Sequence, residues 1–260
     1  MFGITKTQDP QYCVIGLGVF GRHLCRHLAS LSAQVLAIDC REENVAAVKD
    51  YASAAIELDF NNLARFGNYS LENMDAVFIA IGDDFEASMT LTARMQELKV
   101  KKLIVRVLSP MHEHLLNLLG VDRIVVPEEF AARGLAHSIM MRGAVDGYDL
   151  GDGHIIVEAE TPNGLVGRTL REATEKFRRN SILLVTIKRR REKPEKREPH
   201  DETVPDRDVR IEDRARRTLG VPKQADRFEK SDVLVLFGEE TNLREFLDEL
   251  AREAPAEPAP

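Results

Sequence analysis

The sequence predicts an α/β protein in which a doubly wound parallel sheet is followed by a small α+β domain. Short, nearly continuous apolar runs alternate with helical patterns over residues 11–143, as in parallel strands that helices cover on both faces. The first run ends in a glycine-rich turn that opens a helix. Residues 149–250 hold three further apolar runs and two helical patterns, which predicts a separate, smaller domain.

The elements of the first domain follow in a regular order, strand then helix, and the crossovers are expected to be right-handed. Each predicted strand is a short apolar run rather than an alternating one. The predicted strands are 12–18, 33–39, 53–59, 74–82, 101–108 and 121–128. The predicted helices are 20–31, 43–51, 85–98, 112–120 and a long crossover helix over 128–143.

A stretch rich in glycine and aspartate, VDGYDLGDG (residues 145–153), interrupts the pattern and predicts a domain boundary. The second domain is expected to contain strands at 154–161, 181–189 and 232–238 and helices at 169–177 and 242–253.

A highly charged segment at about residues 189–217 interrupts the second domain. It mixes arginine and lysine with glutamate and aspartate and has almost no large apolar residues. Such a composition buries too little apolar surface to offset chain entropy, so we expect a mobile insertion, with 211–219 as a candidate helix in it. The alternative is a basic patch for nucleic acid or lipid, which the interleaved acidic residues disfavour.

Bulk properties narrow the functional classes. The 260 residues carry a formal net charge of -7, which argues against a nucleic-acid partner. No apolar run approaches the roughly 18 residues of a membrane span, and the first residues lack the apolar core of a signal peptide. The three cysteines have neither disulfide nor zinc spacing. We therefore expect a cytoplasmic protein with free thiols and no metal site.

Gly16, Gly18 and Gly21 form the motif G-x-G-x-x-G between the first strand and the first helix. Gly16 permits the tight turn, Gly18 lets a phosphate approach the backbone, and Gly21 lets the helix pack on the strand. The helix start supplies free N–H groups and a partial positive charge. The motif predicts a Rossmann-like nucleotide site, and the alternative is a purely structural turn.

Asp39 ends the second strand, near the spacing expected for a ribose ligand. Its carboxylate would repel a 2′-phosphate, so NADP is disfavoured, while NAD, ATP, ADP and AMP remain candidates. Asp59, Gly82 and Arg106 belong to the neighbouring strands and face the same edge of the sheet. For these three residues, turn chemistry or a surface ion pair is the alternative. No catalytic residue is assigned.

These residues carry a family resemblance. The order VIGLGVFG, VLAID, AIGDDFEAS and GVDRIVVPE resembles the RCK (KTN) domain of the regulatory subunits of bacterial Trk and Ktr potassium uptake systems. The segment EKSDVLVLFGEETNLREF resembles the RCK C-terminal domain, and the charged insertion has no counterpart in the usual pattern.

The resemblance implies a non-catalytic subunit on the inner face of the cell membrane. It implies dimers that assemble into rings, typically octamers, beneath a membrane-embedded potassium-translocating subunit, with ADP, ATP or NAD(H) as the regulatory ligand. It also implies the ligand set. Gly16, Gly18, Gly21 and Asp39 match the family's nucleotide ligands, and Glu128 matches an acidic residue near the terminal phosphate and a divalent cation in some members. The expected binding residues are Gly16, Leu17, Gly18, Val19, Phe20, Gly21, Asp39, Asp59, Phe60, Ile81, Gly82, Arg106 and Glu128.

Val19 departs from the family pattern. Members that respond to ATP often carry arginine after the second glycine, where it reaches a terminal phosphate, and this chain has valine. That difference weakens the case for ATP as the activating ligand. The alternative function is an NAD-dependent dehydrogenase, but the small, polar second domain is a poor substrate pocket for one.

Overall fold

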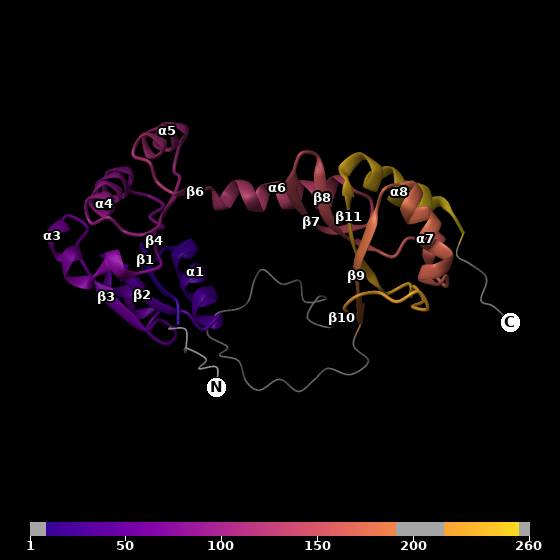
Figure 1. Ribbon diagram of the computed structural model, residues 1–260, viewed down its shortest axis with the longest axis horizontal. Coiled ribbons are helices and arrows are strands. Elements are labelled where there is room, and N and C mark those ends of the chain that lie inside the picture. Colours follow the sequence, from indigo (N-terminus) through magenta and orange to yellow (C-terminus); the bar gives the residue numbers. More distant parts are fainter. Residues whose placement is uncertain (1–8, 191–215, 255–260) are drawn as a thin grey trace, which may run out of the picture. The chain divides into compact units, whose positions relative to one another are not determined.

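The computed structural model describes residues 9–190 and 216–254 of the chain (Figure 1). The chain divides into two compact units, Met1–Glu128 and Glu129–Pro260, and each unit is described by itself. Most of the charged insertion expected at 189–217 lies outside the described residues.

The first unit is built on a six-stranded parallel sheet with the strand order β3-β2-β1-β4-β5-β6. The strands are β1 Gln11–Ile15, β2 Gln34–Asp39, β3 Ala54–Glu57, β4 Ala76–Ile79, β5 Leu103–Arg106 and β6 Arg123–Val125. This is the Rossmann order, in which the chain reverses direction across the sheet between β1 and β4, and ligands bind at that point. The predicted doubly wound fold is therefore confirmed.

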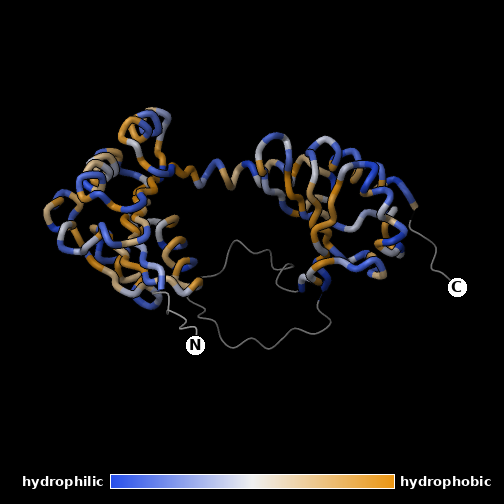
Figure 2. Tube along the Cα trace, in the orientation of Figure 1, coloured by the Kyte–Doolittle hydropathy of each residue, from blue (hydrophilic) through white to orange (hydrophobic). Residues whose placement is uncertain are grey.

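Helices cover both faces of this sheet. They are α1 Val19–Ser30, α2 Glu42–Ala46, α3 Leu63–Phe66, α4 Phe85–Glu97 and α5 Pro110–Leu118, with short 3₁₀ turns at Gly67–Tyr69 and Leu71–Asn73. Side chains alternate along β1, so that Cys13 and Ile15 pack with α3, α4 and α5, whereas Val14 packs with α1 and α2. The central strands are accordingly apolar along their length (Figure 2).

The second unit contains a five-stranded antiparallel sheet with the order β10-β9-β11-β8-β7. Its strands are β7 Ala144–Gly151, β8 His154–Glu160, β9 Leu183–Arg190, β10 Arg216–Thr218 and β11 Val233–Glu239, and its helices are α6 Pro127–Met140, α7 Leu170–Arg179 and α8 Glu240–Arg252, with a 3₁₀ turn at Asn163–Leu165. Apolar residues of α7 and α8 pack with those of β8, β9 and β11 in one core. The predicted small α+β domain is confirmed.

Two local predictions are wrong. The stretch at 145–153 is not a break, because Ala144–Gly151 forms β7, an edge strand that pairs with β8. Its glycine at 147 marks a close approach rather than a turn, since a Cβ there would lie 2.9 Å from the Cβ of His137 on α6. The candidate helix at 211–219 also fails at its described end, where Arg216–Thr218 pairs with β9 as β10.

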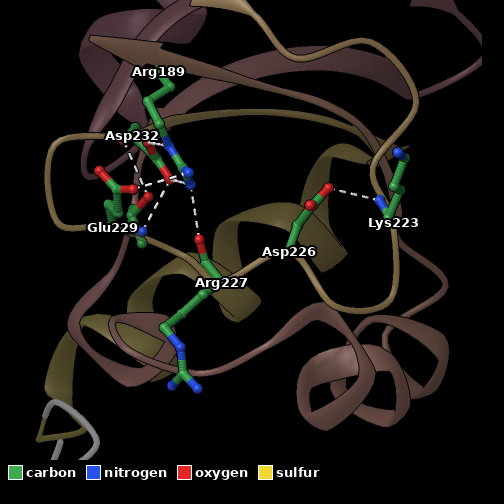
Figure 3. A network of polar contacts seen from close by, with 7 residues as sticks. Arg189, Lys223, Asp226, Arg227, Glu229 and Asp232 are labelled. Carbon is green, nitrogen blue, oxygen red and sulfur yellow. Dashed lines mark hydrogen bonds and ion pairs between the residues drawn. The ribbon is translucent and has the colours of Figure 1, made fainter. Parts of the chain in front are cut away.

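The charged segment begins with a structural arginine. Arg189 belongs to β9, and its Nε and Nη2 donate to the two carboxylate oxygens of Asp232 at 2.8 and 2.7 Å (Figure 3). Asp232 is fully buried, so this two-point contact supplies the partner that a buried carboxylate requires. Arg189 also donates to the carbonyl oxygen of Arg227 and pairs with Glu229 at 2.9 Å.

Among the helices of the described ranges, none has the length and apolar character needed to cross a bilayer.

Candidate functional site

A cleft of about 660 Å³ lies at the carboxyl ends of the strands of the first unit. This volume falls within the range of small-molecule sites. Its lining comes from the turn after β1, from the ends of β2, β4 and β5, and from the loop after β3. The last residue of the first unit, Glu128 at the start of α6, completes it. The lining residues are Gly16, Gly18, Val19, Asp39, Cys40, Arg41, Phe60, Ala80, Ile81, Gly82, Asp83, Asp84, Arg106 and Glu128. We call this site the glycine-turn cleft.

Two of the motif glycines are required by the protein itself. Gly16 has a φ of 94°, in the left-handed region that favours glycine, and a Cβ there would lie 2.9 Å from the backbone nitrogen of Ile81. A Cβ on Gly21 would lie 1.9 Å from the carbonyl oxygen of Gly16. Both positions allow the turn, α1 and β4 to pack closely.

Gly18 differs from the other two. Its φ of -63° suits any residue, and a Cβ there would meet no atom within 4 Å. Gly18 therefore leaves open space at the cleft, where a bound group can approach the backbone. It is the N-cap of α1, and the N–H of Arg22 donates to its carbonyl, so the N–H groups of the first helical turn have no helical partner. This arrangement fits a phosphate.

Asp39 has a structural task in addition to the expected one. The side chain is only 2% exposed, and its Oδ2 accepts from the N–H of Leu17 at 2.6 Å while its Oδ1 accepts from the N–H of Arg41 at 2.9 Å. The carboxylate thus fastens the glycine turn to the end of β2. Each oxygen keeps a further lone pair, so the group can still accept from ribose hydroxyls.

Arg106 brings a positive charge into the cleft. It is the last residue of β5, and its guanidinium lies in the space left by the missing side chain of Gly82. The guanidinium carbon is 6.0 Å from the centre of the Phe20 ring, and Nη2 donates to the carboxylate of Glu128. The absence of a side chain at Gly82 therefore makes room for the guanidinium of Arg106.

The structure brings most of the expected site residues together. Nine of them line the cleft: Gly16, Gly18, Val19, Asp39, Phe60, Ile81, Gly82, Arg106 and Glu128. The remaining four do not. Leu17 and Gly21 are buried beneath the turn, Phe20 packs against Arg106, and the carboxylate of Asp59 accepts from the N–H of Asn61 in its own loop.

Sequence reasoning missed Cys40 and Arg41, which follow Asp39 at the end of β2. Their position in the sequence indicates the site, because residues that directly follow parallel strands lie together at the carboxyl edge of the sheet. Asp83 and Asp84 also line the cleft, and Asp84 caps α4, since its Oδ1 accepts from the N–H of Ala87 at 2.9 Å.

The cleft holds one of the three free cysteines. Cys40 is exposed there, whereas Cys13 and Cys25 are buried in the sheet and in α1. Burial raises the pKa of both buried thiols. The pKa of Cys40 is also raised. Partial burial is the main cause, and the negative charge of Asp39 is the second. In the described part of the chain, no group of three or more His, Cys, Asp or Glu side chains is placed to hold a metal ion.

The chain has clear relatives among potassium uptake proteins. Residues 12–127 match the family model of the TrkA-N domain. The Ktr system potassium uptake protein C of Bacillus subtilis is 34% identical over 182 residues, which cover 70% of this chain and 82% of that protein. The Ktr system potassium uptake protein A of Vibrio alginolyticus is 32% identical over 165 residues, or 64% of this chain and 75% of that protein.

Solved structures share the fold. The RCK domain of GsuK superposes with a TM-score of 0.59 at 14% identity, covering 97% of this chain and 50% of that one. The GsuK channel bound to NAD gives a TM-score of 0.58 at 15% identity, covering 98% of this chain and 41% of that one. The identity to the Ktr system proteins, together with the TrkA-N match over residues 12–127, shows that the chain belongs to the family of these potassium uptake proteins.

Proposed function

We propose that this chain is a nucleotide-sensing regulatory subunit that gates a potassium uptake system. The glycine-turn cleft binds an adenine nucleotide or NAD(H), and binding changes the shape of a ring of subunits. The ring is attached to a membrane-embedded potassium-translocating subunit at the inner face of the cell membrane. The curated Ktr relatives, which are potassium uptake proteins, support the transport role.

The observation that carries the ligand assignment is the arrangement around Gly18. An unobstructed glycine, the start of α1 and the cationic Arg106 all line one cleft. This combination suits a phosphate group, and Asp39 beside it suits the hydroxyls of the attached ribose. Because a 2′-phosphate would bring a second negative charge to Asp39, NADP is disfavoured.

The lining supports sensing rather than catalysis. Among the described residues that line the cleft there is no histidine, lysine, tyrosine or serine. Three of its four carboxylates have other partners: Asp39 accepts from backbone N–H groups, Asp84 caps α4, and Glu128 pairs with Arg106, while Asp83 is the fourth. A dehydrogenase needs a free acid–base group beside the nicotinamide.

Cys40 provides a direct test of binding in the unmodified protein. We expect a thiol alkylating reagent at alkaline pH to label Cys40 and to leave the two buried cysteines unmodified. Saturating ADP, ATP or NAD should slow that labelling, whereas NADP at the same concentration should not. A Cys40→Ser variant is the control for the site of labelling. Labelling that no nucleotide slows would contradict the assigned cleft.

A transport measurement tests whether nucleotide binding gates the potassium-translocating subunit. The protein is co-reconstituted with its potassium-translocating subunit in proteoliposomes, and potassium flux is measured with and without the nucleotides that protect Cys40. Flux should depend on this subunit and change with nucleotide. A flux that is insensitive to both would show that the cleft serves another purpose.

A further inference from the structure

Arg106 is fixed in the glycine-turn cleft by contacts on several sides. Its side chain is only 18% exposed, its guanidinium occupies the space over Gly82, and it faces the ring of Phe20. Among the described residues its Nε is buried and has no hydrogen-bond partner. A guanidinium carries five N–H donors, so this side chain offers more donors than its one carboxylate partner uses.

Glu128, the partner, is held far less firmly. Its side chain is 63% exposed and projects from the second position of α6, directly after Pro127. A carboxylate at this end of a helix is favoured by the helix dipole. Water and the helix therefore stabilise Glu128 when Arg106 does not. Moving the Glu128 carboxylate away from the ion pair therefore costs little free energy. Moving the Arg106 guanidinium out of the cleft costs more, because it would lose its other contacts there.

From this difference we infer that Glu128 is an exchangeable counter-ion: the phosphate of a bound nucleotide takes over the Arg106 guanidinium and displaces the Glu128 carboxylate. The inference rests on the proposed nucleotide site. It gives Glu128 two effects. The carboxylate weakens binding by competing with the ligand, and its release changes the electrostatic environment of the first turn of α6.

The solvent exposure of the ion pair sets how strongly Glu128 competes with a ligand phosphate for Arg106. A partly exposed ion pair contributes the equivalent of roughly a two- to fivefold change in an equilibrium constant. Removing the Glu128 charge should therefore tighten the binding of a phosphate-bearing ligand by that factor. Adenosine has no phosphate to compete, so its affinity should stay the same.

The test compares Glu128→Gln with Glu129→Gln. Glu129 is the next residue on α6, is similarly exposed, and pairs with Arg133, so its variant removes the same charge without touching Arg106. Affinities for ADP and adenosine are measured by calorimetry with a chelator of divalent cations present. E128Q should bind ADP about two- to fivefold more tightly than the wild type, and E129Q should match the wild type.

A double variant separates exchange from simple repulsion between Glu128 and the phosphates. In an Arg106→Met background the gain from E128Q should vanish, because no guanidinium remains to exchange. If the gain persists there, the carboxylate acts on the ligand directly and the exchange is wrong. Equal or weaker ADP binding by E128Q alone would also overturn it. A wild-type protein that binds none of ADP, ATP and NAD would instead refute the nucleotide site itself.

Discussion

At position 19 the cleft presents a valine, where the resemblance to ATP-responsive members of the family implies an arginine. Val19 lines the glycine-turn cleft as the first residue of α1, and its side chain is 69% exposed. Valine offers neither a charge nor a donor to a terminal phosphate. Arg22, one turn later, does not compensate, because its Nη1 donates to Asn44 at 3.4 Å and it does not line the cleft.

We expect the wild type to discriminate between ATP and ADP by less than about tenfold, and Val19→Arg to shift the preference toward ATP. A charge-assisted contact contributes roughly 1.5–3 kcal/mol, or about ten- to a hundredfold, and salt screening favours the lower end. Competitive titration with magnesium measures both. Val19→Gln, which adds length without charge, is the matched control. A hundredfold ATP preference in the wild type would point to Arg106 as the terminal-phosphate ligand.

Asp39 is expected to contribute both to the stability of the fold and to nucleotide binding. In Asp39→Asn the amide can accept with one atom only, so one of two N–H groups loses its acceptor: that of Leu17, in a buried setting, or that of Arg41, in a partly buried one. Leaving a buried donor unpaired costs about 1–3 kcal/mol, and the free energy of unfolding in urea should fall by that amount. Nucleotide and NAD(H) affinities should fall together. Asp59→Asn, in an exposed loop, should change neither, and an equally stable D39N protein would contradict the described role.

At the scale of elements, we expect alanine substitutions at two glycines of the turn to have opposite effects on stability. Gly21→Ala forces a Cβ against the Gly16 carbonyl oxygen, and we expect a loss of more than roughly 3 kcal/mol of stability, the upper end of overpacking. Gly18→Ala meets no protein atom, so its stability should stay within about 1 kcal/mol of the wild type.

Binding should separate the two variants further. A methyl group at Gly18 occupies the space that a phosphate needs, so we expect at least roughly a tenfold loss of nucleotide affinity in a fully folded protein. Circular dichroism and urea denaturation report the fold, and calorimetry reports the ligand. A Gly18→Ala protein that binds as the wild type would show that no phosphate approaches this turn.

The elements that sequence reasoning located are those with a strong local signal. Central strands such as β1 and β4 are continuous apolar runs because both faces are buried. Strand β7 was not predicted because its sequence lacks a continuous apolar run. It is an edge strand with one neighbour, β8, and it carries a glycine where α6 packs closely. The Arg106–Glu128 pair could not be found from sequence, since β5 and β6 bring the two residues together only in the folded sheet.

At the scale of the whole molecule, the first unit supplies the cleft and the second supplies an antiparallel sheet with its own core. Helix α6 begins at the division between them and carries an unusual surface. None of its residues is buried, and four large apolar side chains are exposed: Phe130, Leu135, Ile139 and Met140. A helix that exposes apolar residues in this number normally packs against another chain.

We therefore expect the protein to associate with itself through α6, as the ring proposal requires. Light scattering at micromolar concentration should give a dimer or a larger assembly. Phe130→Glu with Ile139→Glu should shift it to monomer, because each buried apolar side chain contributes roughly 1.5–3 kcal/mol to an interface and a symmetric dimer loses each contact twice. Val221→Glu is the control, since Val221 is 86% exposed but lies outside α6. If the wild type is a strict monomer, gating through a ring is excluded, although the cleft could still bind nucleotide.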